Sequence, residues 1–357
     1  MGMHHRRLRI SCWLVLWLGC AFGAAAQTPA GVGFAAITIH DPVSGGAMPG
    51  YVFYPSARAS GATRIGPYLL HATRDARPLA GAKPLVVISH GHGGSDLGHH
   101  DLAVYLAGHG FVVETLEHPG DNYHDTGGTG TAQVLVGRPI QVKAAISRLL
   151  GDPRWAALID PGRIGVAGFS AGGYTALLSV GAIPRFDRFV SYCQAHPGDI
   201  GSCGTPTFIA GLLHRSGQPS VRAYMDAMQK ELGRWGTTAD PRIKAAFAMA
   251  PLGLVFGPSG LAHVDRPVFL YYGQHDQVLS PRYNALHVAP LIRTLAGIKR
   301  VPAAGHYVFL SPCSPQLAKE APELCVDPPG VDRVAVHRQV DADALAFFRK
   351  TLGAPAR

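Results

Sequence analysis

The sequence predicts an α/β protein with a mostly parallel central sheet that carries helices on both faces. Apolar runs of strand length alternate with segments of helical periodicity along most of the 357 residues, a pattern typical of this class. Several runs lack polar alternation, as strands buried on both faces do. The chain is long enough for one large domain, which we expect over residues 27–357.

The first elements predict an antiparallel pair of strands. β-Branched and aromatic residues fill 35–40 and 51–54, and the turn-forming segment 41–46 separates them. Residues 55–83 show no clear period, so we expect an irregular surface segment there. The apolar run at 83–89 predicts the first fully buried strand.

Strands and helices alternate in the next part of the chain. The spacing of Leu102 and Leu106 predicts a helix, which is followed by a strand at 111–116. Apolar positions recur through 138–150 as in an amphipathic helix. Another short apolar run, at 164–167, leads into a segment of small residues that can start a helix.

The alternation breaks at 184–241 and then resumes. This stretch contains prolines, glycines and two cysteines, and it predicts one helix at 221–232. We expect it to form a cap over the sheet edge at which the parallel strands end, held by its own disulfide. Further strands and a closing helix are expected at 243–250, 267–272, 298–302 and 336–352.

Residues 1–26 predict a cleaved signal peptide. A basic stretch precedes the apolar run 12–22, and the small residues 24–26 offer a cleavage site. The run is short for a membrane span, and no other stretch of the sequence approaches spanning length. We therefore expect a periplasmic or secreted protein. Cys20 hints at a lipid anchor, but the bulky Trp17 three residues earlier disfavours one.

The charge of the chain excludes one class of partner. Removing the signal peptide takes away three arginines and no acids, so the formal charge falls from +9 to +6. Lysines and arginines form no block, so the sequence has no signature of nucleic-acid binding. An ordinary solubility charge explains this mild basicity, and peripheral contact with anionic lipid is the alternative.

Four cysteines follow the signal peptide: Cys193, Cys203, Cys313 and Cys325. Three pairings are possible, and we expect the two local ones, 193–203 and 313–325. In an oxidising compartment each would close a short loop and stabilise the fold by about 3 kcal/mol. Neither pair has the spacing typical of a zinc site.

Residues 168–172 form the motif G-x-S-x-G, which marks a nucleophile elbow. In such an elbow Ser170 lies on a sharp strand-to-helix turn, and Gly168 and Gly172 are needed because a Cβ would collide there. The following helix directs its free N–H groups at the place where an oxyanion would form. A glycine-rich loop with an incidental serine would show the same five residues, so the rest of the chain has to decide.

A serine nucleophile needs a base and a residue that orients the base. In hydrolases with this elbow the order along the chain is Ser, Asp or Glu, His. Asp276 follows the strand at 267–272 and His306 follows the last strand, which predicts that both lie at the sheet edge of Ser170. His306 would carry the proton and Asp276 would hold its tautomer. A helix N-cap is the alternative role for Asp276.

Residues 90–95, His-Gly-His-Gly-Gly-Ser, are similar to the oxyanion loop that follows the third strand of esterases. We predict that the backbone N–H groups of His92 and Ala171 bind the developing negative charge. The side chains of residues 90, 92, 96 and 99–101 also permit a zinc site by their spacing. Since an oxyanion loop already explains the motif, we expect neither a metal nor a cofactor.

Four blocks carry a family resemblance: V-V-I-S-H-G-H-G at 86–93, L-A-G-H-G-F-V-V at 106–113, E-H-P-G-D at 117–121 and G-V-A-G-F-S-A-G-G at 165–173. They resemble the dienelactone-hydrolase-like bacterial α/β-hydrolases and the platelet-activating-factor acetylhydrolases. The resemblance covers about residues 84–310. It implies the α/β-hydrolase fold, here with a cap insertion after the nucleophile helix.

Two departures narrow the activity that this resemblance implies. Dienelactone hydrolases use a cysteine where this chain has Ser170. In the acetylhydrolases the triad acid follows the sixth strand, and the matching place here, near 249–251, holds no carboxylate. The acid is therefore expected at Asp276, and the resemblance argues only weakly for an acetylhydrolase substrate.

The sequence thus predicts a secreted serine esterase that works through an acyl-enzyme on short-chain acyl or acetylated lipid esters. The candidate acyl-binding residues are Phe169, Leu252, Val255 and Phe256, together with the cap. Core packing explains these four equally well. The open alternatives are a polyester hydrolase, a serine peptidase of the same fold, and an inactive hydrolase-fold binding protein. The last would be expected to lack a triad residue, and none is missing.

Overall fold

The computed structural model describes residues 1–2, 31–236 and 238–353. From residue 3 onward, the expected signal peptide lies outside the described residues, and so does Cys20. None of the helices in the described ranges combines the length and apolar character that are needed to cross a bilayer.

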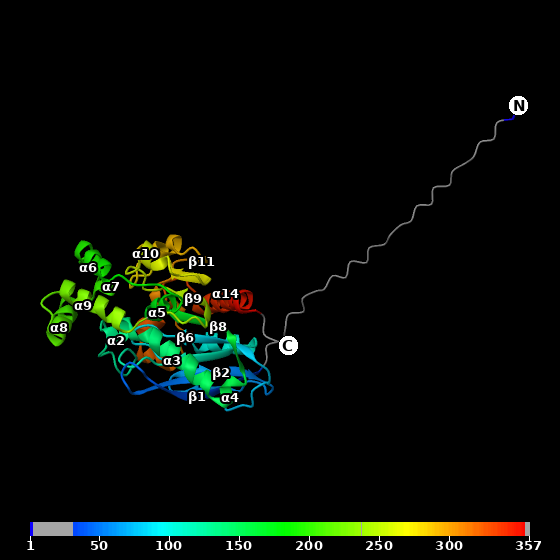
Figure 1. Ribbon diagram of the computed structural model, residues 1–357. Helices are drawn as coiled ribbons and strands as arrows, with labels where there is room; N and C mark the ends of the chain where they lie inside the picture. The colour runs from blue at the N-terminus through cyan, green and yellow to red at the C-terminus, as the bar shows by residue number, and fades with distance from the viewer. Residues whose placement is uncertain (3–30, 237, 354–357) are drawn as a thin grey trace.

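A nine-stranded sheet forms the centre of the structure (Figure 1). Its strands are β1 (Gly31–His40), β2 (Ala47–Ser56), β5 (Thr73–Arg74), β6 (Lys83–Ser89), β7 (Val112–Leu116), β8 (Ile159–Phe169), β9 (Ile243–Met249), β10 (Val268–Gly273) and β11 (Leu295–Val301). They lie in the order β11-β10-β9-β8-β6-β7-β2-β1-β5. Neighbours from β11 to β7 are parallel, whereas β2 is antiparallel to both β7 and β1. The predicted parallel sheet and antiparallel first pair are confirmed.

Helices cover both faces of this sheet, as predicted. One face carries α1 (His100–Gly108) and α14 (Arg333–Leu352), and the other carries α3 (Gly137–Gly151) and α5 (Ala171–Ser179). Each face has its own apolar core. Phe111 and Phe348 belong to the α14 side, with ring centroids 6.5 Å apart, whereas Val142 and Leu177 belong to the α3 side.

Short elements occupy the remaining connections. They are β3 (Thr63–Ile65), β4 (Tyr68–Leu70), α2 (Ala132–Leu135), α4 (Pro153–Ala156), α10 (Pro258–Leu261), α11 (Ala285–Val288), α12 (Pro315–Glu320), α13 (Pro322–Cys325) and the 3₁₀ turns η1 (Ala289–Leu291) and η2 (His306–Phe309). The expectation of an irregular segment over 55–83 was wrong in part, because β3 and β4 pair there as a hairpin. Strands of three residues are too short to show a periodicity.

The segment that follows α5 is helical. It contains α6 (Phe186–Ala195), α7 (Ile200–Cys203), α8 (Pro206–Ser216) and α9 (Val221–Arg234), which Figure 1 shows grouped at one side of the molecule. Only α9 was expected. The start of α8 carries a readable signal, since Thr205 caps the helix and Pro206 follows at its first position.

Two disulfides form between cysteines that are close in sequence. Cys193 bonds Cys203 across 10 residues, and Cys313 bonds Cys325 across 12. The expected local pairing is confirmed. The first bridge joins α6 to α7 within the insertion, and the second closes the segment that contains α12 and α13.

Candidate active site

Ser170 lies at a sharp turn between β8 and α5. Its backbone has φ of 57° and ψ of −116°, a conformation that residues with a Cβ rarely adopt. Two hydrogen bonds tie the turn to the neighbouring segment: Ser170 N–H donates to Met249 O at 2.9 Å, and Leu252 N–H donates to Ser170 O at 3.3 Å. The G-x-S-x-G segment therefore has the backbone shape of a nucleophile elbow.

Two glycines make this turn possible. A Cβ added at Gly168 would lie 2.1 Å from Gly172 O, and one added at Gly172 would lie 1.9 Å from Ser89 O. Both distances are far below van der Waals contact. The predicted collisions are confirmed, although the Gly172 collision is with the end of β6 and not across the turn itself.

The side chains of Ser170, His306 and Asp276 meet in a line of hydrogen bonds. His306 Nε2 lies 2.9 Å from Ser170 Oγ, and His306 Nδ1 lies 2.6 Å from Asp276 Oδ2. The exposed fractions of the three residues are 8%, 4% and 5%, respectively. Because Ser170 follows β8, Asp276 follows β10 and His306 follows β11, the parallel sheet brings all three to one edge.

Asp276 is held from its other oxygen as well. Its Oδ1 accepts hydrogen bonds from the backbone N–H groups of Val278 at 2.9 Å and Leu279 at 2.7 Å. The carboxylate therefore bonds the backbone that follows it with one oxygen and contacts His306 with the other. It does not cap a helix, which was the alternative role, because the next helix in the described chain, α11, begins at Ala285 after Asn284.

The loop after β6 lies against Ser170. A Cβ added at Gly91 would be 3.4 Å from the Cβ of Ser170, so little space separates the loop from the elbow. Neither the backbone N–H of His92 nor that of Ala171 donates a hydrogen bond to any described residue. Two backbone donors on the segments that flank Ser170 are thus available to a ligand.

A buried arginine bonds the backbone of this loop. Arg138, at the start of α3, is 1% exposed. Its guanidinium donates to His90 O at 2.6 Å and to Gly91 O at 3.2 Å, and it lies 3.0 Å from Asp121 Oδ2. Burial disfavours the charged form of Asp121, but Arg138 outweighs burial and lowers the pKa of the carboxyl. Asp121 in turn accepts a hydrogen bond from the imidazole of His92.

Sequence reasoning missed Arg138, although a signal exists. Arg138 shares one face of the amphipathic helix with Val142, Ala145 and Leu149, all of which are buried. A charged residue on an apolar stripe is rarely buried without a partner. That position therefore indicates a buried ion pair. The acid of the pair, Asp121, lies in the block E-H-P-G-D at 117–121.

The histidines near the loop have structural roles. The Nδ1 atoms of His90, His99 and His100 bond the carbonyl oxygens of Gly91, Phe309 and Leu97. Burial lowers the pKa of His90 to about 3 and that of His99 to about 4, so both rings are neutral at physiological pH. In the described part of the chain, no group of three possible metal ligands includes a histidine of this loop.

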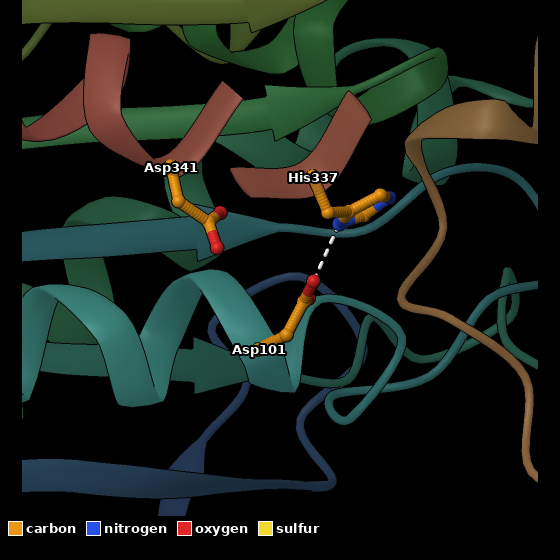
Figure 2. A group of neighbouring side chains, drawn as sticks. All are labelled: Asp101, His337 and Asp341. Atoms are coloured by element: carbon orange, nitrogen blue, oxygen red, sulfur yellow. Dashed lines mark hydrogen bonds and ion pairs between the residues drawn. The ribbon is translucent and has the colours of Figure 1, made fainter. Parts of the chain in front are cut away.

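Asp101, His337 and Asp341 do form such a group, with donor atoms within 4.8 Å of one another (Figure 2). The ring of His337 bonds Asp101 through Nδ1 and Val308 O, at 2.9 Å, through Nε2. Burial disfavours the imidazolium, but Asp101 outweighs it and raises the pKa of His337. With both ring nitrogens donating, no lone pair remains for a metal. We interpret the group as a buried ion pair that anchors η2, the turn of His306, to α1 and α14.

A cavity of about 710 Å³ opens beside the elbow. Its walls include Gly91, His92 and Phe169 from the site, together with residues of the β3–β4 hairpin, the loop after β7 and the segment closed by the second disulfide. Of the predicted acyl-binding residues, Phe169 lines this cavity. Leu252, Val255 and Phe256 do not, and Phe256 is fully buried with its ring stacked on that of Tyr174. No described residue of 184–241 contributes to its walls.

Comparison with known proteins identifies the fold. No family model and no curated protein sequence matches the chain. Among solved structures, 925 chains match. One is a ferulic acid esterase from Streptomyces cinnamoneus, 20% identical, with a TM-score of 0.59 and coverage of 94% of each chain. Together with the nine-stranded sheet and the elbow at Ser170, this likeness shows that the chain has the α/β-hydrolase fold.

Proposed function

We propose that the protein is a serine hydrolase that cleaves carboxylic esters through an acyl-enzyme intermediate. The observation that carries the proposal is the buried line of hydrogen bonds from Ser170 through His306 to Asp276. A serine hydroxyl is a poor nucleophile on its own and needs an adjacent base. The contacts of His306 with Ser170 and with Asp276 support these roles of base and orienting carboxylate.

In the proposed reaction His306 Nε2 accepts the Oγ proton of Ser170 while Oγ attacks the ester carbonyl carbon. The free N–H groups of His92 and Ala171 stabilise the oxyanion of the tetrahedral intermediate. When the intermediate collapses, the bond to the alcohol breaks and His306 returns the proton to the leaving oxygen. Water then repeats the sequence on the acyl-enzyme, which releases the acid and restores Ser170.

Asp276 keeps the imidazole in the tautomer that presents the lone pair of Nε2 to Ser170, and it stabilises the imidazolium that forms. Arg138 has a positioning role. Because its guanidinium bonds two consecutive carbonyls, those of His90 and Gly91, it fixes the peptide that precedes the His92 donor.

For the substrate, short-chain acyl or acetylated lipid esters remain our first candidate. The cavity of about 710 Å³ has room for a group much larger than acetyl, and Tyr51, Tyr68 and Tyr307 line it. These aromatic walls favour a second candidate, an ester of an aromatic acid, which is the class named for the ferulic acid esterase. The two disulfides support a periplasmic or extracellular location.

The experiment is a hydrolysis profile over p-nitrophenyl esters from acetyl to palmitoyl, methyl ferulate, and a phospholipid panel. It is run on the wild type and on Ser170→Ala. Turnover of at least one carboxylic ester by the wild type, with loss in the folded Ser170→Ala protein, is the expected result. Equal rates for the two proteins on every ester would contradict the proposal.

A further inference from the structure

The cavity beside the elbow is acidic, although the protein as a whole is basic. Asp96, Glu117 and Glu320 line it, and no described lysine or arginine does. The formal charge of the whole chain is +9. The acidic lining therefore does not follow from the composition of the chain and is a property of this cavity. Such a lining attracts cations.

Glu117 presents an unpaired carboxyl to this cavity. It directly follows β7 and is only 8% exposed, and its carboxyl makes no hydrogen bond or ion pair with any described residue. An unpaired buried carboxylate is costly. Burial, followed by the nearby Asp96, raises the pKa of Glu117 to about 7. The side chain therefore faces the cavity without a counter-charge from the protein.

Asp96 strengthens this arrangement from the loop after β6. Its only side-chain hydrogen bond within the described chain is the one it accepts from Ser95 Oγ at 3.3 Å. Burial raises the pKa of Asp96 to about 6. Two acids that interact with each other in one cavity repel when both are ionised, and a bound cation would relieve that repulsion.

Aromatic side chains line the same cavity as the two acids. Tyr51 of β2, Tyr68 of β4 and Tyr123 line the same cavity. Burial raises the pKa of each of these tyrosines, and Asp96 and Glu117 both add to the rise. The two acids and the three tyrosines therefore lie close enough to interact electrostatically. Tyrosine rings attract cations through their faces, and they accept quaternary ammonium groups that make no hydrogen bonds.

We propose that Glu117 and Asp96, with the surrounding tyrosines, form a cation subsite, and that the preferred ester carries an ammonium group. The inference rests on the proposed function, since the subsite adjoins the elbow through Phe169 and His92. An organic cation fits better than a metal ion, because neither acid belongs to a group of three metal-ligating side chains in the described residues. A phosphate would be repelled by the two carboxylates.

The test compares cationic esters with uncharged esters of the same shape. Butyrylcholine is paired with 3,3-dimethylbutyl butyrate, which places the charge in the alcohol. Phenyl 4-(trimethylammonio)butanoate is paired with phenyl 5,5-dimethylhexanoate, which places it in the acyl group. In at least one pair we expect kcat/KM to favour the cation by about tenfold or more, as a desolvated cation–aromatic contact with a counter-charge allows.

Glu117→Gln should bring that ratio close to one, mainly through a fall in kcat/KM for the cationic ester. The matched control is Glu320→Gln, at an exposed position on the rim of the same cavity, which should leave most of the preference intact. A ratio near one in both pairs, with the uncharged esters hydrolysed, would overturn the subsite and leave the esterase proposal standing.

The pH dependence of the ratio is a second readout. Glu117 is faced by Asp96, Tyr51, Tyr68 and Tyr123, with His124 and Arg74 nearby. Ionised acids bind the cation, so the ratio should rise from pH 5.5 to pH 8.5. Both esters of a pair are cleaved by the same triad, so the pH dependence of the chemical steps cancels in the ratio. A ratio that does not change with pH would contradict the assignment to Glu117.

Binding without turnover separates this inference from the proposed function. Calorimetry with phenyltrimethylammonium and the Ser170→Ala protein should show binding that is lost on adding Glu117→Gln. Absence of binding would overturn the subsite even if the esterase proposal holds. Binding by a protein that hydrolyses no ester would retain the subsite and reject the esterase proposal.

Discussion

His306 Nδ1 lies 2.6 Å from Asp276 Oδ2, and both side chains are almost inaccessible to solvent. A bond of this kind fixes which nitrogen of the ring carries the proton. In the proposed mechanism it leaves Nε2, at 2.9 Å from Ser170 Oγ, as the acceptor for the serine proton.

Asp276→Asn should therefore reduce kcat by about four orders of magnitude, because the amide stabilises the wrong tautomer of the imidazole. Asp265→Asn is the control, since Asp265 is an exposed acid whose one ion pair within the described residues is with Arg266, at 3.4 Å. Steady-state kinetics on one p-nitrophenyl ester compare the two variants. If Asp265→Asn lost more rate than Asp276→Asn, the acid would be misassigned.

Arg138→Met should lower both stability and activity. It leaves Asp121 buried without its counter-charge, which costs about 3–5 kcal/mol in the free energy of unfolding. Arg138→Lys keeps a charge but not the fork that bonds two carbonyls, so we expect kcat to fall by up to about 10²–10³, the cost of losing an oxyanion donor.

The control for Arg138 is Arg148→Ala on the same helix, where the ion pair with Asp152 is at the surface. It should change both measures little. Urea unfolding and kcat at saturating ester provide the measurements. Wild-type kcat in Arg138→Lys would contradict the positioning role.

Asp341→Asn should make the protein more stable at pH 8. Burial, with a contribution from Asp101, raises the pKa of Asp341 to about 8 from an ordinary value of 3.8. The native carboxyl keeps its proton while the unfolded one loses it, so this residue reduces stability progressively as pH rises from about 4 to 8. Removing the acid should recover about 2 kcal/mol or more at pH 8 and almost nothing at pH 4.

Thermal unfolding from pH 4 to pH 8.5 measures this difference. Some loss of stability toward high pH should remain in Asp341→Asn, because His337 also has a raised pKa and its contribution disappears as pH rises through that value. A variant that is equally destabilised at every pH would show that Asp341 makes a hydrogen bond the protein needs.

Removing either disulfide should lower stability by a similar amount, but only removal of the second should weaken substrate binding. Replacing both Cys313 and Cys325 by serine removes about 3 kcal/mol by the chain-entropy estimate and loosens a wall of the cavity, to which Cys313, Leu317 and Leu324 contribute. We expect KM to rise more than kcat falls. The matched Cys193 and Cys203 double variant should lose similar stability with KM unchanged, since that bridge does not line the cavity. Equal KM values for the two double variants would show that the second bridge does not affect substrate binding.

Sequence reasoning succeeded where one physical constraint acts over a short stretch. The buried strands were predicted because both of their faces must be apolar. The sharp turn at Ser170 was predicted because positions 168 and 172 leave no room for a Cβ and therefore require glycine. The meeting of Ser170, Asp276 and His306 follows from a parallel sheet, in which residues after successive strands share one edge.

What sequence reasoning missed depends on contacts between distant segments. Arg138 and Asp121 are 17 residues apart and pair because α3 packs against the loop after β7, which contains Asp121. The cavity is another example, since the 184–241 insertion was expected to form its wall, whereas β4 and α12 supply residues to it. Phe256 was a candidate because it is apolar, and an apolar side chain is equally suited to the core in which it lies.

The assignment of Ser170 as the nucleophile is tested most directly by covalent labelling with a fluorophosphonate, followed by peptide mapping. We predict one labelled serine, in the peptide that contains Ser170, and no label in a folded Ser170→Ala protein. Label on a different serine, or ester hydrolysis at the wild-type rate by Ser170→Ala, would contradict it.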